Sequence, residues 1–246
     1  MNKPFLILQI RPEDQAADDE YQAFLRAGDL SPNDTVRVQL DRQSIPEDID
    51  VRNNSGIILG GGPACVSDAP NKKPSYQTRF ERELLELMKQ VEARDTPFIG
   101  ACYGIGLLAA YLGTTVDKSA YSEAVGAVEV NITEAGREDP LLNGIPDSFH
   151  AFTGHKEAVQ SLPPETTLLV DGKKCPNQMI RYQQNIYGLQ FHPELDPAGL
   201  ELRIRTYRDL GYFKPEDADQ LIEDGYAAAV KYPQTIFKNF VNHYSS

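Results

Sequence analysis

Short apolar runs separated by longer polar stretches are the feature that most constrains the fold of this chain. Three such runs, rich in β-branched or large side chains, are Phe5 to Ile10, Thr35 to Leu40 and Gly56 to Leu59. Each has the length of a buried strand, and helix-forming residues fill the stretches between and after them. Buried strands that alternate with helices predict an α/β fold with a largely parallel central sheet and helices on both faces.

The rest of the chain continues this alternation. The clearest helix is predicted over 76–93, where apolar residues recur at three- and four-residue steps among charged ones. A buried strand at 97–100 and a core helix at 103–112 follow. Further strands are predicted at 124–132, 167–170, 178–182 and 186–191, the last two as a hairpin, and helices at 200–210, 215–226 and 230–244. We therefore predict one domain over 1–246, with a core at about 5–195 and a helical C-terminal portion at about 197–246.

Composition excludes several classes of protein. Hydrophobic residues make up 41% and charged residues 24% of the chain, which is ordinary globular usage. The net charge of −12 disfavours nucleic acid as a partner. The uncharged segment 96–116 contains Pro97 and four glycines, so we interpret it as a buried strand, turn and helix and expect no membrane partner. Three cysteines without paired spacings favour a reduced, cytoplasmic protein, and we expect no metal and no cofactor.

A cysteine lies between a predicted strand and a predicted helix in the segment Gly100-Ala101-Cys102-Tyr103-Gly104. Glycines on both sides permit the sharp, strained turn that exposes a nucleophile at the end of a strand. The N terminus of the following helix is expected to lower the pKa of the Cys102 thiol. The alternative is a buried structural cysteine in a glycine-rich turn.

A histidine and a carboxylate follow another predicted strand, in the segment Gln190-Phe191-His192-Pro193-Glu194. A thiol nucleophile needs a base that later acts as an acid, and a carboxylate that orients the base. Cys102, His192 and Glu194 supply these three roles.

Three consecutive glycines, Gly60 to Gly62, directly follow the predicted strand at 56–59. Backbone N–H groups exposed there can hold a phosphate or form half of an oxyanion hole. No Gly-Lys-Ser/Thr or G-x-G-x-x-G pattern accompanies them in the sequence, so we favour the oxyanion hole.

The segments GIILGGGP at 56–63, GACYG at 100–104 and LQFHPE at 189–194 resemble, in this order, the signature segments of class I (triad-type) glutamine amidotransferases. Within that family the chain is most similar to the free-standing proteins labelled as the glutamine amidotransferase domain of GMP synthase. The resemblance implies a flavodoxin-like fold. It also implies hydrolysis of the side-chain amide of L-glutamine to glutamate and ammonia through a glutamyl thioester.

The same resemblance implies individual roles. Cys102 would attack the amide, His192 would protonate the ammonia, and Glu194 would orient His192. The N–H groups of Gly62 and Tyr103 would hold the oxyanion. Substrate contacts are implied at Gly61, Gly106, His155 and Lys156.

Two of these substrate positions depart from the family pattern. Gly106 stands where the family usually has a glutamine that contacts the substrate. His155-Lys156-Glu157 resembles a His-x-Asp loop near the amino-acid end of the substrate, with Glu in place of Asp, and a solvated loop is the alternative interpretation.

Three functions stay open at this point. The first is an ammonia-producing amidotransferase subunit. The second is a hydrolase of another γ-glutamyl compound, which the loss of a glutamine contact at Gly106 would favour, and the third is a catalytically silent relative that binds a partner. After Glu194 the sequence has 52 residues and no SGGxDS segment, so we expect a separate synthetase subunit to receive the ammonia.

Overall fold

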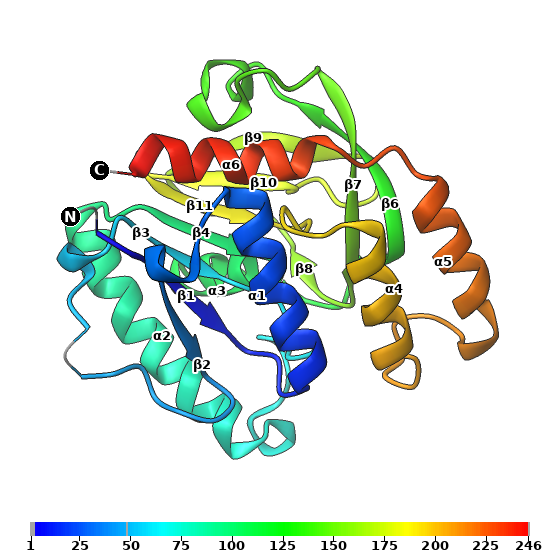
Figure 1. The fold of residues 1–246 in the computed structure, drawn as a ribbon, viewed down its shortest axis with the longest axis horizontal. Helices are drawn as coiled ribbons and strands as arrows, with labels where there is room; N and C mark the ends of the chain where they lie inside the picture. The colour runs from blue at the N-terminus through cyan, green and yellow to red at the C-terminus, as the bar shows by residue number, and fades with distance from the viewer. Residues whose placement is uncertain (1–2, 48, 246) are drawn as a thin grey trace.

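A nine-stranded sheet runs through the computed structural model, which describes residues 3–47 and 49–245 (Figure 1). The strand order is β2-β1-β3-β4-β11-β10-β9-β6-β7. The first five of these are parallel neighbours: β2 (Thr35–Gln39), β1 (Phe5–Gln9), β3 (Gly56–Leu59), β4 (Phe98–Ala101) and β11 (Ile186–Leu189). Because the carboxyl ends of parallel strands meet at one edge, the loops after β3, β4 and β11 come together there.

The other four strands extend the sheet in antiparallel fashion: β10 (Met179–Tyr182), β9 (Thr166–Gly172), β6 (Glu123–Ile132) and β7 (Ser148–His155). A separate two-stranded pair is formed by β5 (Val116–Asp117) and β8 (Ala158–Val159). The hairpin predicted between β10 and β11 is present.

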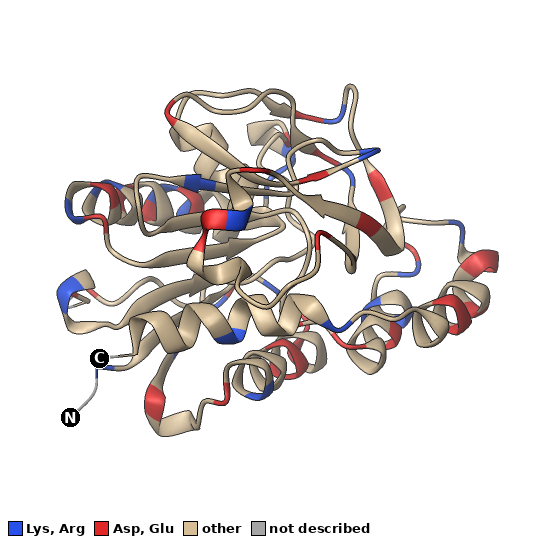
Figure 2. Ribbon diagram, turned by 90° about the horizontal axis from the view of Figure 1, so that it is seen from above, with Lys and Arg blue, Asp and Glu red and all other residues tan. Residues whose placement is uncertain are grey.

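Helices cover both faces of the parallel half, because successive side chains of a buried strand point to opposite faces. From β1, Leu6 and Leu8 enter one hydrophobic cluster with α2 (Ser75–Arg94) and α3 (Tyr103–Tyr111). Phe5 and Ile7 enter another with α1 (Asp14–Gly28) and α6 (Tyr232–Tyr244). Figure 2 shows charged positions along these helices and the parallel strands mostly in tan. The predicted α/β fold is therefore confirmed.

The C-terminal helices do two different things. Helices α4 (Pro197–Thr206) and α5 (Ala218–Ala227) pack together in a third cluster that includes Phe152 of β7 (Figure 1). Helix α6 crosses back beside α1, and its Phe237 and Phe240 are fully buried in the main core. The segment beyond residue 197 thus contributes to the core itself.

The structure differs from the sequence prediction in detail. Strand β7 lies in a segment for which we predicted no element, although alternate residues of it are buried against β6. Helix α4 ends at Thr206, four residues earlier than predicted, and Pro215–Asp217 forms a 3-10 turn before α5. Over the described residues, none of the helices combines the length and apolar character needed to cross a membrane.

Candidate active site

Cys102 occupies a sharp turn between β4 and α3. Its backbone has φ 51° and ψ −89°, a conformation that costs free energy for a residue with a side chain. Gly100 makes the turn possible, because a Cβ atom there would lie 2.8 Å from Gly104 Cα. The N–H of Cys102 donates to Leu189 O at 2.7 Å and ties the turn to β11, which leads to His192. This is the strand–turn–helix context that the sequence predicts for a nucleophile.

His192 and Glu194 form a buried pair three residues beyond β11. Their exposed fractions are 6% and 2%, and His192 Nδ1 lies 3.1 Å from Glu194 Oε1. The carboxylate accepts a hydrogen bond from Nδ1 and leaves Nε2 as the nitrogen free to exchange a proton with a reactant. The N–H of His192 donates to Phe152 O at 3.0 Å, which fixes the backbone of the pair against β7.

The side chains of Cys102 and His192 both lie next to Gly61. A Cβ atom at Gly61 would lie 3.2 Å from Cys102 Cβ, 2.6 Å from His192 Cε1 and 3.4 Å from His192 Nε2. No larger residue fits there without moving one of the two side chains. The side chains of Cys102 and His192 therefore both lie against Gly61.

The two proposed oxyanion donors flank the same point. Gly62 and Tyr103 line one cleft together with Cys102. Tyr103 is the first residue of α3, and within residues 3–47 and 49–245 the N–H groups of Gly62 and Tyr103 donate to no other backbone or side-chain group. Unused N–H groups beside a nucleophile can stabilise a developing negative charge.

The ionisation of the three groups corrects one expectation. Burial raises the pKa of the Cys102 thiol to about 12, and the nearby Arg11 only partly offsets this effect, so the lowered pKa expected from the helix N terminus is wrong. Burial lowers the pKa of His192, whereas Glu194 acts in the opposite direction. Burial alone would raise the pKa of Glu194, but the charges of His192 in its protonated form and of Arg203 outweigh it and lower the pKa overall. The resting site thus holds a neutral thiol, a neutral imidazole and a carboxylate.

Two clefts meet at Cys102. The first, which we call the arginine cleft, has a volume of about 460 Å³ and contains His192. Most of its other lining residues come from the segment after β1, from β6 and β7, and from the C-terminal segment. They are chiefly Arg11, Val125, Thr153, Leu200, Arg203, Tyr207, Tyr212 and Phe213. The lysine cleft, of about 350 Å³, is lined chiefly by Cys65, Tyr103, Gly106, His155, Lys156, Glu157 and Tyr212. Cys102, Gly62 and Tyr212 belong to both clefts.

His155 is the last residue of β7 and is only 4% exposed, so the solvated loop considered from the sequence is wrong. Its Nε2 bonds to Glu123 Oε2 at 3.0 Å and its Nδ1 to Glu157 O at 2.8 Å. Glu123, His155 and Cys175 also place three potential metal-ligating atoms within 4.8 Å of one another. The carboxylate there accepts a further hydrogen bond from Gln178 Nε2 at 2.8 Å, which accounts for the cluster as a buried polar network.

Lys156 and Gly106 face the lysine cleft. The Nζ atom of Lys156 lies 4.3 Å from the centre of the Tyr212 ring and donates to Leu210 O at 3.3 Å. A Cβ atom at Gly106 would lie 3.4 Å from Val66 Cγ2 and 3.7 Å from Glu157 Oε1, so a small side chain fits there. The cleft therefore combines one cation and one carboxylate near the nucleophile.

Comparison with known proteins decides the family. The sequence profile described as "Glutamine amidotransferase class-I" matches residues 30–203. The chain belongs to this family. The match includes Cys102, His192 and Glu194, and it confirms the enzyme class predicted from the sequence, a cysteine-dependent glutamine amidotransferase.

Named relatives and a solved structure are consistent with the assignment of this chain to the class-I glutamine amidotransferases. The chain is 35% identical over 159 residues to a glutamine-hydrolyzing GMP synthase subunit of Methanosphaera stadtmanae, covering 63% of this chain and 75% of that protein. The subunit of the same name from Pyrococcus abyssi is 30% identical over 150 residues, covering 61% and 71%. A glutamine amidotransferase structure from Thermotoga maritima has a TM-score of 0.77 at 22% identity and covers 98% and 97% of the two chains, which supports the fold.

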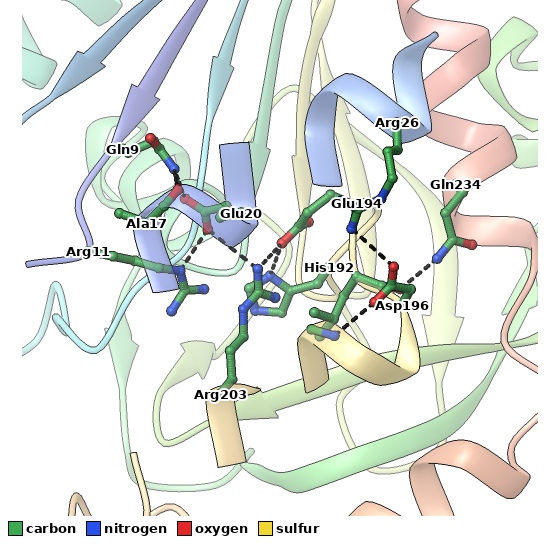
Figure 3. A network of polar contacts seen from close by, with 12 residues as sticks. Gln9, Arg11, Ala17, Glu20, Arg26, His192, Glu194, Asp196, Arg203 and Gln234 are labelled. Carbon is green, nitrogen blue, oxygen red and sulfur yellow. Dashed lines mark hydrogen bonds and ion pairs between the residues drawn. The ribbon is translucent and has the colours of Figure 1, made fainter. Parts of the chain in front are cut away.

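The amidotransferase site includes a buried ionic network that sequence reasoning missed (Figure 3). Arg203 Nη2 donates to Glu194 Oε1 at 2.9 Å and lies 3.9 Å from Glu20 Oε1. Arg11 donates through Nε to Glu20 Oε1 at 2.8 Å and through Nη1 to Tyr207 Oη at 3.0 Å. The carboxylate that bonds to His192 is thus itself held by an arginine from α4.

A signal for this network was present in the sequence. Arg203 lies on the same helical face as Leu200 and Tyr207, three residues after the first and four before the second. Glu20 lies in a similar way among the buried alanines of α1. A charged residue within an apolar stripe indicates a buried ionic partner, but the sequence does not say which one.

Proposed function

We propose that this chain hydrolyses the side-chain amide of glutamine to glutamate and ammonia. One observation carries the proposal: a neutral, buried His192, oriented by Glu194, lies beside Gly61 together with Cys102, which occupies a strained strand–helix turn. Because the thiol is also neutral at rest, the reaction begins with proton transfer and not with a preformed thiolate.

The acylation step uses the free nitrogen of the histidine. Cys102 Sγ attacks the amide carbon while its proton moves to His192 Nε2, and the C–S bond forms as the C=O bond becomes C–O⁻. The N–H groups of Gly62 and Tyr103 stabilise this oxyanion. When the C–N bond breaks, the proton on Nε2 passes to the departing nitrogen, so ammonia and a glutamyl thioester result.

The deacylation step repeats the same proton movements with water. A water molecule gives a proton to His192 Nε2 as its oxygen attacks the thioester carbon. Collapse of the second oxyanion breaks the C–S bond, and the proton returns from Nε2 to Cys102 Sγ. Glu194 stays ionised throughout, because its charge stabilises the imidazolium that forms twice in the cycle.

The lysine cleft is the proposed site of the glutamyl part. It places Lys156 and Glu157 in the wall of one small pocket, which fits the two opposite charges of an α-amino acid. Glu157 is held in position by hydrogen bonds from Val66 N at 2.7 Å and Ser67 N at 2.9 Å. Because both ring nitrogens of His155 are engaged by protein atoms, we propose that His155 supports this wall and that Lys156 makes the contact.

We also propose that a separate synthetase subunit receives the ammonia. The relatives named as subunits of GMP synthase support an organisation of this kind. A cytoplasmic location is proposed from the cysteine content, and Cys65, Cys102 and Cys175 are all free thiols.

Glutamate release from glutamine by the purified chain tests the proposal directly. A second measurement reports the thioester chemistry: a glutamine analogue with an electrophilic side chain is expected to label Cys102, as mapped by peptide mass. Cys65 is an internal comparison, because it lines the same cleft and burial raises its pKa to about 11. Equal labelling of both cysteines, together with no glutamate release, would contradict the proposed function.

A further inference from the structure

The arginine cleft lies beside Cys102 and has no role in holding the glutamyl group. His192, which protonates the departing nitrogen in the proposed reaction, lines this cleft and does not line the lysine cleft. The side of Cys102 that faces the leaving group is therefore the arginine cleft. On the same measure this cleft is larger than the lysine cleft, about 460 Å³ against about 350 Å³.

The charge of this cleft has one sign. Arg11 and Arg203 line it, and none of its described lining residues carries a carboxylate. Glu20 and Glu194 pair with the two arginines but are not part of the wall. The lysine cleft differs, because it holds a cation and a carboxylate together.

Polar groups in the wall of the cleft lack partners. Within the described residues, Arg203 Nε and Nη1 and Thr153 Oγ1 form no hydrogen bond, although Arg203 is 6% and Thr153 2% exposed. Arg11 uses only Nε and Nη1 in its contacts with Glu20 and Tyr207. Buried donors are normally satisfied, so these atoms of Arg203 and Thr153 leave hydrogen-bonding capacity unused beside the cleft.

Aromatic and aliphatic residues complete the cleft. Val125, Leu200, Tyr212 and Phe213 lie in the same wall as the arginines, and three of these four come from the segment that follows His192. An apolar wall with a few convergent polar groups is typical of a site for an organic molecule.

We propose that the arginine cleft is a subsite for a leaving amine that carries a carboxylate. The substrates are then γ-glutamyl amides of amino acids, in addition to glutamine, and the inference rests on the proposed function of the same site. The reaction is the same acyl transfer: the amide C–N bond breaks, His192 Nε2 protonates the amine, and water hydrolyses the thioester to glutamate. The carboxylate of the amine accepts hydrogen bonds from the guanidinium groups and Thr153.

Two substrates of matched shape measure the effect of the carboxylate alone on kcat/KM. γ-Glutamylglycine and γ-glutamylisobutylamide have leaving amines of similar size, and only the first carries the charge. Both substrates form the same glutamyl thioester, so defects in the triad or in deacylation cancel in the ratio of their kcat/KM values. We expect the unmodified chain to prefer γ-glutamylglycine by about tenfold or more.

Two variants test which side chains bind the carboxylate of the leaving amine. Arg203→Met is expected to bring the ratio close to one, even though it also slows both substrates by releasing Glu194. Thr153→Val, which keeps the shape of the side chain, is expected to lower the ratio by a few-fold. A ratio near one in the unmodified chain, or a ratio that Arg203→Met leaves unchanged, would overturn the inference.

Binding to the Cys102→Ala protein, measured by calorimetry, separates this inference from the proposed function. Tighter binding of γ-glutamylglycine than of γ-glutamylisobutylamide is expected there, and equal affinity of the two would refute the subsite whether or not any substrate is hydrolysed. The absence of turnover with glutamine and with both amides would instead contradict the proposed function alone.

Discussion

Replacing Gly61 with alanine adds one methyl group against the side chains of Cys102 and His192, the proposed nucleophile and base. The new Cβ would lie 2.6 Å from His192 Cε1 and 3.2 Å from Cys102 Cβ. Ordinary carbon–carbon contacts are about 3.5–4.0 Å, so His192 would have to move by roughly 1 Å. A displacement of that size in a reacting pair costs about 100-fold in rate. We therefore expect Gly61→Ala to lower kcat for glutamine about 100-fold.

The measurement is the steady-state release of glutamate, with the thermal unfolding midpoint recorded for each variant. Gly104→Ala is the matched control, because it lies in the cysteine turn and its added Cβ would come no closer than 3.7 Å to Leu59 O. We expect this control to keep kcat within a few-fold of the unmodified chain. If Gly61→Ala folded normally and also kept its kcat, the assignment of Cys102 and His192 as a reacting pair beside Gly61 would be wrong.

Other residues of the site give four further predictions. Cys102→Ala is expected to lower glutamine turnover by several orders of magnitude, as glutamate release will report. Because burial lowers the pKa of His192 and the base must be neutral, kcat/KM should fall with decreasing pH only below about 6.5; a midpoint well above 6.5 would contradict this. Arg203→Gln removes a positive charge that lowers the pKa of His192, so the acid limb of the kcat/KM profile should move to higher pH. The same change should lower kcat about tenfold. The control Arg205→Gln, at an exposed position of the same helix, should change neither the acid limb nor kcat. Gly106→Gln should lower KM for glutamine with little change in kcat, since it adds binding common to the ground and transition states; a higher KM would count against that contact.

Much of the fold could be predicted from local sequence patterns. The runs that became β1, β3 and β4 are almost entirely apolar and are buried throughout, because both faces of a parallel strand are covered by helices. Apolar residues recur every three or four positions along α2 because one face of that helix packs on the sheet. Strand β7 was missed, since its alternation of buried and exposed residues is interrupted where it passes from the sheet edge to the active site.

The same holds for the reactive groups. The cysteine between two glycines and the histidine two residues before a glutamate are short-range patterns, because the turn and the Nδ1 contact are formed within a few residues. That the two segments follow neighbouring strands, β4 and β11, is a tertiary contact between distant parts of the chain. The sequence by itself thus determined the fold class and the family, and it identified the three residues that we propose as the triad.

Only the tertiary structure decided the environment of those groups. The pKa of Cys102 depends on burial by segments far away in the sequence, and this outweighs the local effect of the helix on which the expectation rested. Arg203 comes within 3.9 Å of Glu20 only because α4 packs beside α1. The arginine cleft exists only because the C-terminal segment folds over Cys102. Burial, charge pairing and cavity shape arise from contacts between distant residues, so no short segment of this sequence carries them.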